Sequence, residues 1–277
     1  MKRKLKAKQI FSLVGGAAVV LTAAQLTLLG AKGGIGPLKF LRNNRMAKMP
    51  GNAEKYHPEH VQALEKSLLK GKKLLFLGSS VTYGSATMGV SMADYIAALD
   101  ECEVVKEAVS GTTLSGNGGS TYVARLKKVD KSTQFDAVIC QLSTNDASQK
   151  RELGAVSDSR RMAGFDIKTV IGAIEYIIAY TQETWNCPLI IYTGTQYDSA
   201  AYQAMVDALP ALQEKWGIGV IDLWNDDEMN EVSDEDYALY MNDGVHPTQA
   251  GYLRWWVPKF EAYLYEFFDG MDIRRIP

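Results

Sequence analysis

The chain has 277 residues, of which 47% are hydrophobic and 22% are charged, and its formal net charge is −2. This apolar content excludes an intrinsically disordered chain, because such a sequence can bury enough surface to offset the entropy lost on folding. Ten of the 30 basic residues precede Gly51 whereas all 32 acidic residues follow it, so the body is acidic and lacks the basic surface that nucleic-acid binding requires.

The chain begins with a pattern typical of membrane targeting. Five basic residues between Lys2 and Lys8 precede an uncharged, mostly apolar run from Gln9 to Ala31. About 20 apolar residues cross a bilayer as a helix, and this run is just long enough. We expect residues 1–31 to be an N-terminal signal anchor that holds the body outside the membrane, or a signal peptide whose removal leaves a secreted protein.

A connector is expected to follow the leader. Glycine, proline and asparagine interrupt every long periodicity between residues 32 and 56, which favours a linker there and a single domain over residues 57–277. The three cysteines, Cys102, Cys140 and Cys187, form no C-x-x-C pair, so no disulfide framework or structural zinc site is expected.

The body alternates short apolar runs with helical patterns. Runs of this kind predict buried strands at residues 74–77, 104–105, 137–140, 189–192 and 220–223. Apolar residues spaced three and four apart predict helices at residues 60–69, 91–99, 167–185, 200–216 and 249–268. This alternation predicts an α/β fold with a parallel sheet covered by helices on both faces, with ligands binding at the carboxyl ends of the strands.

A serine-containing turn follows the first strand. The segment from Gly78 to Gly84 reads Gly-Ser-Ser-Val-Thr-Tyr-Gly, which also suits a helix cap or a phosphate-binding loop. The segment lacks the lysine of a P-loop, and Thr82 stands where a G-x-S-x-G nucleophile elbow would have its last glycine. The turn alone therefore leaves a structural role and a catalytic role open.

Residues at the other strand ends suggest chemistry. Gly111 follows the second strand, Asn145 follows the third, and Asp243 precedes His246 by three positions near the C-terminus. A serine hydroxyl becomes a nucleophile when a base takes its proton; His246 is a suitable base, with Asp243 holding its other ring nitrogen. The backbone N–H groups of Ser80 and Gly111 and the amide of Asn145 are candidate donors to an oxyanion.

These residues resemble a known family. Ser80, Gly111, Asn145 and His246, in this order, are similar to the four block residues of the SGNH hydrolases, also called GDSL-type esterases and lipases. The resemblance covers about residues 72–265. It implies a flavodoxin-like three-layer α/β/α fold with a five-stranded sheet, a triad of serine, histidine and Asp243, and ester hydrolysis with no metal or organic cofactor.

Two positions depart from the family pattern. Ser79 stands where the family usually has aspartate, which leaves two adjacent serines, and alignment on Gly78, Thr82 and Gly84 selects Ser80 as the nucleophile. Ser143 stands where the third block usually has glycine. Neither change removes a catalytic group, but both leave the substrate class open.

Two further features lie beside the expected site. Asp146 is interpreted as a residue that ties down the loop after the third strand, in preference to a second acid or base. The long polar segment at residues 147–164 is interpreted either as a solvated loop or as a lid or substrate wall.

We expect a serine ester hydrolase that acts outside the membrane and removes small acyl groups, such as acetyl, from carbohydrate. The polar candidate lid argues against a substrate with long acyl chains. Alternatives are an acyltransferase on the same scaffold, a lipase or lysophospholipase-type esterase, and a binding module that has lost catalysis. The expected partners are the ester substrate and, through the N-terminal helix, the membrane.

Overall fold

The chain contains two units by its contacts, Met1–Met49 and Pro50–Pro277. This computed structural model describes residues 39–274. The first unit contains helix α2 (Lys39–Ala47), within the segment where we expected a linker. The predicted anchor or signal peptide at residues 1–31 lies outside the described residues and stays a prediction. None of the helices between residues 39 and 274 is long and apolar enough to cross a membrane.

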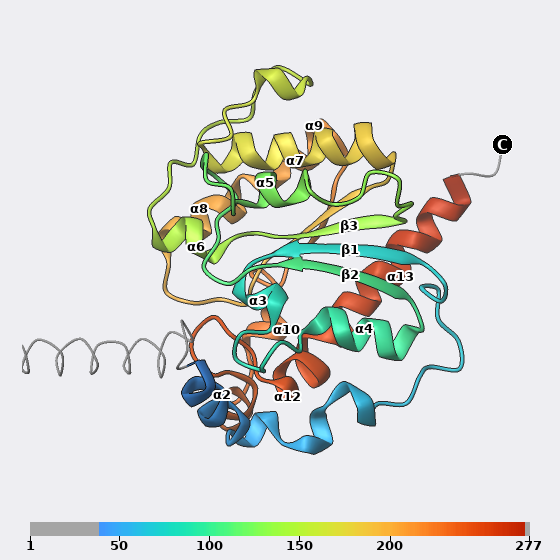
Figure 1. Ribbon diagram of the computed structural model, residues 1–277, viewed down its shortest axis with the longest axis vertical. Helices are drawn as coiled ribbons and strands as arrows, with labels where there is room; N and C mark the ends of the chain where they lie inside the picture. Colours follow the sequence, from blue (N-terminus) through green and yellow to red (C-terminus); the bar gives the residue numbers. More distant parts are fainter. Residues whose placement is uncertain (1–38, 275–277) are drawn as a thin grey trace, which may run out of the picture. The chain divides into compact units, whose positions relative to one another are not determined.

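The second unit is built on a five-stranded sheet in which every pair of neighbours is parallel (Figure 1). The spatial order of the strands is β2-β1-β3-β4-β5. The chain adds β2 on one side of β1 and then crosses over to add β3, β4 and β5 on the other side. The predicted strands are confirmed, with these bounds: β1 (Lys73–Gly78), β2 (Glu103–Ala108), β3 (Ala137–Gln141), β4 (Leu189–Tyr192) and β5 (Gly219–Ile221).

Helices cover both faces of the sheet because the strands are apolar on both faces. In β1, Leu75 and Leu77 belong to one buried cluster, whereas Leu74 and Phe76 belong to another. The first cluster is completed by α5 (Tyr122–Leu126), α7 (Val170–Trp185), α8 (Ala200–Asp207) and α9 (Leu209–Trp216). The second is completed by α4 (Met92–Asp100), a π-helix (Tyr252–Trp256) and α13 (Val257–Arg274).

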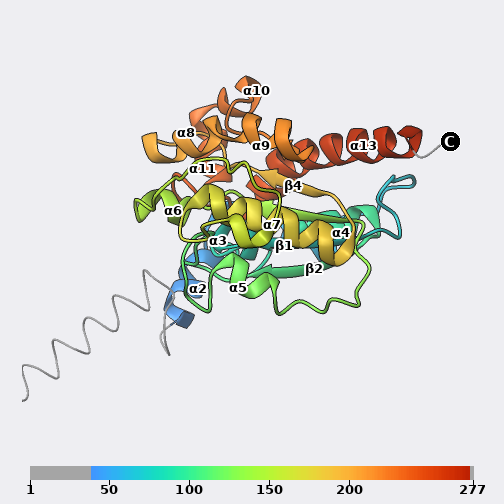
Figure 2. The same cartoon turned by 90° about the horizontal axis from the view of Figure 1, so that it is seen from above.

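The remaining elements are short. Figure 2 shows α8, α9 and α10 on the side of the sheet where β4 lies, and α5 on the side of β2. The short helices are α3 (Ser80–Tyr83), α6 (Thr144–Ser148), α10 (Asp227–Asn230), α11 (Asp234–Tyr240) and α12 (Gln249–Gly251). Single 3-10 turns occupy Pro50–Asn52, Glu54–Tyr56, Pro58–His60 and Met162–Gly164.

Two of the predicted helices differ from the structure. The segment at residues 60–69 is irregular after a 3-10 turn, because Val61 adopts an extended conformation and the N–H of Leu64 bonds to the carbonyl of Leu99. The segment at residues 200–216 is two helices joined at Ala208. Pro210 has no N–H to donate to the carbonyl four residues earlier, so a continuous helix cannot form there.

The body also begins earlier than expected. The Asn52 side chain donates to the carbonyl of Ala86 at 2.8 Å and accepts from the N–H of Gln249 at 2.9 Å. The carbonyl of Tyr56 accepts from the hydroxyl of Tyr95 at 2.6 Å. Residues 50–56, which we assigned to the linker, therefore pack on the body, whose compact unit starts at Pro50 and not at residue 57.

Two carboxyl groups meet at the interface of α4 and α13. Asp100 is 1% exposed, and its Oδ1 accepts from the hydroxyls of Ser67 and Tyr265, each at 2.5 Å. Asp100 Oδ2 and Glu261 Oε1 are buried and receive no hydrogen bond from the described residues. Burial first, then the nearby charge of Asp100, raise the pKa of Glu261 to about 7. A proton shared between the two carboxyls would give both oxygens a hydrogen-bond partner.

This carboxyl pair predicts a pH-dependent stability. Because folding raises the pKa of Glu261 from 4.5 to about 7, the unfolded chain releases the proton first, and the free energy of unfolding falls as pH rises through that range. Glu261→Gln removes this dependence. Thermal melts followed by circular dichroism should show the variant gaining Tm relative to the wild type between about pH 5 and pH 8.

The control is Glu266→Gln, which removes one charge from an exposed position on the same helix. A Tm difference between Glu261→Gln and the wild type that stays constant over this pH range would contradict the shared proton.

Candidate active site

A sharp turn between β1 and α3 exposes one serine at the carboxyl edge of the sheet. Ser80 is the first residue of α3 and remains 7% exposed, whereas Ser79 is completely buried. Gly78 is the last residue of the strand, and its position leaves no room for a side chain. A Cβ at this position would lie 1.6 Å from Thr82 Oγ1 and 2.8 Å from Gln141 Oε1. The turn therefore depends on a glycine packed against two polar side chains.

Ser80 lies in line with a histidine and an aspartate from the other end of the chain. His246 Nε2 is 2.8 Å from Ser80 Oγ. On the other side of the ring, His246 Nδ1 is 2.9 Å from Asp243 Oδ1 and 3.0 Å from Oδ2. An ionised carboxylate only accepts hydrogen bonds, so Nδ1 carries the ring proton and Nε2 is free to accept from the serine. This arrangement activates the Ser80 hydroxyl as a nucleophile.

Asp243 is held as an anion. Burial alone would raise its pKa, but the hydrogen bond and charge of His246, together with the backbone N–H groups of Val245 and His246, hold the pKa of Asp243 well below its usual range. Both N–H groups donate to Oδ1 at 2.9 Å, and the amide of Asn242 donates to Oδ2 at 2.7 Å. The carboxylate is fixed in orientation and stays charged to stabilise a protonated imidazole.

Asn145 brings an amide donor to the same cleft from α6. Its Nδ2 donates to Ser79 Oγ at 3.1 Å and to the carbonyl of Thr112 at 2.9 Å. The second contact joins α6 to the loop after β2, which contains Gly111. Gly111 has a φ of +81°, a backbone conformation that favours glycine. Gly111 lines a second hollow of about 250 Å³ and not the cleft that contains Ser80.

The cleft around Ser80 and His246 has a volume of about 340 Å³, and its walls combine apolar surface with several polar side chains. A cavity of about 10 Å³, room for one water-sized group, adjoins it. Thr144, Tyr197 and Val245 line both spaces, and Val81, the neighbour of Ser80, lines the cavity. The full set of residues around the cleft is Ser80, Thr144, Asn145, Ser148, Tyr197, Asp198, Ser199, Val245 and His246.

Gln141 is a supporting residue that sequence analysis missed. It ends β3, is 2% exposed, and its Oε1 accepts from the N–H of Ser79 at 2.9 Å and the hydroxyl of Thr82 at 2.8 Å. The hydroxyl of Ser79 also donates to it, at 3.3 Å. A lone polar residue at the end of an otherwise apolar strand is the signal that marks it. Gln141 holds the turn that presents Ser80.

Arg125 is a second supporting residue, with no comparable sequence signal. Its guanidinium is buried beneath the strand ends, and one nitrogen donates to the carbonyl of Gly78 at 2.6 Å and to Thr112 Oγ1 at 3.2 Å. The other terminal nitrogen donates to the carbonyl of Glu107 at 2.8 Å and to its carboxylate at 2.9 Å. Arg125 thus ties together the ends of β1 and β2 and the loop that contains Gly111.

Asp146 acts as a structural tie, as interpreted, but the loop that it holds follows β2 and not β3. Its carboxylate accepts from the N–H groups of Leu114 and Ser115 at 2.7 and 3.0 Å, and from the hydroxyl of Ser115 at 2.5 Å. Ser143, in the place of the usual glycine, caps α6 by accepting from the N–H of Asp146. The residue after Asn145 therefore holds the neighbouring loop and faces no reacting group.

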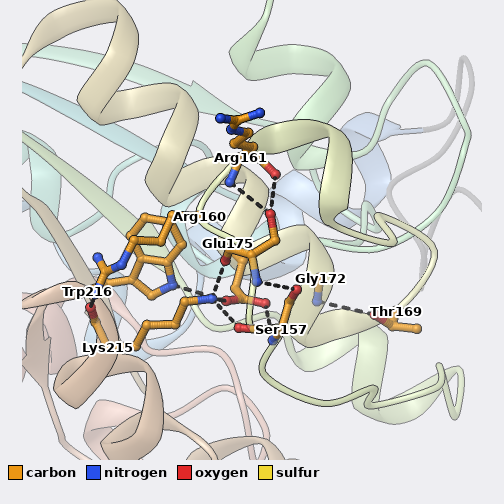
Figure 3. A network of polar contacts seen from close by, with 9 residues as sticks. Ser157, Arg160, Arg161, Thr169, Gly172, Glu175, Lys215 and Trp216 are labelled. Carbon is orange, nitrogen blue, oxygen red and sulfur yellow. Dashed lines mark hydrogen bonds and ion pairs between the residues drawn. The ribbon is translucent and has the colours of Figure 1, made fainter.

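The polar segment after α6 is fixed to the helical layer. Glu175 on α7 is completely buried and accepts from Lys215 Nζ at 2.5 Å and from the N–H of Ser157 at 2.9 Å (Figure 3). Lys215 also donates to the carbonyls of Ser157 and Ser159, and Arg160 donates to the carbonyl of Lys215. Within residues 147–164, only Ser148 lines the cleft, so these contacts do not support a lid.

The described residues contain no group of three or more histidine, cysteine, aspartate or glutamate side chains arranged to hold a metal ion. Cys102, Cys140 and Cys187 are buried, and burial raises the pKa of each thiol to about 12. Thiols this far from ionisation are poor nucleophiles. Ser80 is therefore the nucleophile candidate that the geometry supports.

Comparison with known proteins identifies a family whose pattern this chain matches. The family described as GDSL-like Lipase/Acylhydrolase matches residues 76–254, which include Ser80, Gly111, Asn145 and the Asp243–His246 pair. A comparison with curated proteins finds no match.

Several solved structures share the fold. A protein from Lactobacillus plantarum is 20% identical over 73% of this chain and 98% of its own, with a TM-score of 0.57. A protein named as a GDSL-like lipase from Bacteroides ovatus ATCC 8483 is 14% identical over 71% and 99%, with a TM-score of 0.54. A family two carbohydrate esterase from Clostridium thermocellum, in complex with cellohexaose, is 14% identical over 76% and 66%, with a TM-score of 0.50. Likeness at these identities shows the fold alone.

The geometry predicts which of the two adjacent serines reacts. A fluorophosphonate probe bonds covalently to a serine hydroxyl that a base activates, and only Ser80 lies at hydrogen-bond distance from His246. We expect Ser80→Ala to abolish labelling. Ser79→Ala should keep labelling at a reduced rate, because Asn145 loses an acceptor. Gel fluorescence and peptide mass spectrometry measure both; attachment of the probe to Ser79 in the Ser80→Ala protein would refute the assignment.

Gln141 is predicted to support both the fold and the turn. Gln141→Met keeps the side-chain length but removes the acceptor, which leaves the buried N–H of Ser79 without its partner. Losing such a partner costs about 1–3 kcal/mol, so urea denaturation should report a fall of that size in the free energy of unfolding. Labelling of Ser80 should also slow. Gln62→Met, at an exposed position, is the control; equal stability of the two variants would contradict this role.

Proposed function

The chain belongs to the GDSL-like lipase/acylhydrolase family of carboxylic ester hydrolases, as its resemblance predicted, and on this premise we propose that it removes small acyl groups, above all acetyl, from carbohydrate. The observation that carries the proposal is the unbroken contact chain from Ser80 through His246 to Asp243, with 2.8 Å and 2.9 Å between successive atoms. This arrangement suits acyl transfer to a serine hydroxyl.

The reaction proceeds in two halves. His246 takes the proton of Ser80 as its Oγ attacks the ester carbonyl, and the carbonyl oxygen becomes an oxyanion. The amide of Asn145 and the N–H group of Ser80 stabilise this charge, and the N–H group of Gly111 stays a predicted third donor. The intermediate collapses, His246 donates the proton to the departing alcohol, and an acyl-Ser80 ester remains. Water, activated by His246, then releases the acid, while Asp243 stabilises the imidazolium in both halves.

The contacts of Asn145 favour the transition state over the substrate. In the free protein both amide hydrogens of Asn145 are engaged, by Ser79 Oγ and by the carbonyl of Thr112. A neutral substrate carbonyl gains little by competing with these acceptors. An oxyanion is the stronger acceptor, because charge-assisted hydrogen bonds are about twice as strong as neutral ones. The serine hydroxyl at position 79 is a partner that the amide can exchange as charge develops.

The size of the adjoining cavity supports a small acyl group. The space next to Val81 is about 10 Å³, which admits one group the size of a water molecule or a methyl. A long acyl chain would have to extend through the open cleft, where part of its apolar surface stays in contact with water and contributes no binding energy. Acetyl therefore suits the space beside Ser80 better than a fatty acyl chain does.

The walls of the cleft support a polyhydroxylated alcohol as the other half of the ester. Thr144, Ser148, Asp198 and Ser199 contribute hydroxyls and a carboxylate that hydrogen-bond readily to sugar hydroxyls. The carbohydrate esterase from Clostridium thermocellum is an example of the fold acting on such substrates. The basic and apolar leader at residues 1–31 supports a location outside the membrane, with the body anchored or secreted.

Acyl-chain length tests the proposal. We expect the purified protein to hydrolyse p-nitrophenyl acetate at least about tenfold more efficiently, in kcat/KM, than the octanoate, because each further methylene must find space beside Ser80. Ser80→Ala should abolish release of p-nitrophenol. Preference for octanoate would favour a lipase or lysophospholipase-type esterase. Faster transfer to an added sugar acceptor than to water would favour an acyltransferase.

A further inference from the structure

A groove borders the same loop as the catalytic cleft. Thr195 and Gln196 line this groove, which has a volume of about 290 Å³, whereas the next three residues along the chain, 197–199, line the cleft. Helices α10 and α11 and the π-helix form further walls, through Asn230, Tyr237 and Trp255. Because residues 195–199 together border both spaces, a ligand longer than the reacting group can extend from the cleft into the groove.

Aromatic rings give the groove a preformed surface. Trp255 is only 9% exposed and stacks on Tyr240, with ring centroids 5.8 Å apart and an interplanar angle of 24°. Tyr237 is 37% exposed, one of the few large apolar side chains so exposed among the described residues. Flat aromatic rings pack well against the C–H faces of sugar rings, and a tyrosine or tryptophan still offers a polar group at its edge. These two side chains are suited to a pyranose ring.

The polar wall of the groove is held in place before any ligand binds. Asn230 Oδ1 accepts from the N–H of Gln196 at 2.8 Å, and Asn230 Nδ2 donates to the carbonyls of Leu223 and Trp224 at 2.9 and 3.1 Å. Gln196 Nε2 also donates to the carbonyl of Trp224, at 2.9 Å. A ligand therefore meets an ordered wall, which lowers the entropy lost on binding.

The surface charge around the groove selects against anions. The carboxylate of Asp234 lines the groove, and α10 and α11 place further exposed carboxylates around it: Asp227, Glu228, Glu231, Glu235 and Asp236. Lys259 pairs with Glu228 at 2.6 Å, but the carboxylates still outnumber it. Their combined field repels a polymer that carries carboxylates, whereas the single carboxylate in the groove can accept hydrogen bonds from sugar hydroxyls.

We propose that this groove is a subsite for an uncharged glycan, holding a sugar unit next to the unit whose ester Ser80 attacks. The inference rests on the proposed function, because it assigns the alcohol half of that ester to an oligosaccharide. It places substrate selection in α11 and Trp255, outside the catalytic residues. The subsite makes hydrolysis depend on the length of the glycan.

Binding can be tested without turnover. Ser80→Ala keeps the groove but cannot consume substrate, so isothermal titration of this variant with xylotetraose reports binding alone. Adding Tyr237→Ala should weaken binding about fivefold to tenfold, the range expected for one lost aromatic contact. Tyr237→Phe should retain most of the affinity. Tetragalacturonate, a carboxylated tetramer, should bind more weakly than xylotetraose. Equal affinities with and without Tyr237, or tighter binding of tetragalacturonate, would overturn the subsite.

Kinetics separates this inference from the function on which it rests. The wild type should hydrolyse acetylated xylotetraose with a higher kcat/KM than acetylated xylose, and Tyr237→Ala should reduce that preference about fivefold to tenfold. Leu68→Ala, which removes another exposed apolar side chain, should leave the preference unchanged. Hydrolysis of p-nitrophenyl acetate with no length preference would overturn the subsite alone. No hydrolysis of any ester would overturn the proposed function, and the titration would still decide whether the groove binds glycan.

Discussion

The turn between β1 and α3 is the constraint on which the site depends. A serine can reach a histidine 166 positions later only if the chain leaves the sheet sharply, and the space around Gly78 excludes any side chain. Buried side chains from other segments hold the start of this turn in place. Gln141 accepts hydrogen bonds from the N–H of Ser79 and the hydroxyl of Thr82. Arg125 donates to the carbonyl of Gly78, where the turn begins. Reactivity at Ser80 therefore depends on polar groups that never touch substrate.

Two carboxyl groups illustrate how placement decides the role of an acid. Asp243 receives hydrogen bonds from backbone N–H groups and faces a histidine, which lowers its pKa and keeps it charged. Glu261 is half-buried beside Asp100, and burial together with the Asp100 charge raises its pKa to about 7. The first arrangement serves proton transfer at the site. The second links α4 to α13 and makes the stability of the fold sensitive to pH.

Much of the fold could be predicted because its signals are local. Short continuous apolar runs, which predict strands buried on both faces of a sheet, identify β1 to β5. The spacing of apolar residues identifies α4 and α7. Local patterns failed where distant contacts decided the outcome. The N–H of Leu64 bonds to α4, so residues 60–69 form no helix, and Asn52 binds two distant segments, so the expected linker is partly body. Pro210 was a local signal for the break between α8 and α9.

The sequence by itself determined the strand ends, the order of Ser80, Gly111, Asn145, Asp243 and His246, and the family to which they belong. These features are readable because each depends on residue type and on a few neighbours. Only the tertiary structure decided that Asn145 donates to Ser79, that Arg125 and Gln141 hold the turn, and that an aromatic groove adjoins the cleft. Such contacts join residues far apart in the chain, and no local pattern encodes which distant atoms folding brings within hydrogen-bond distance.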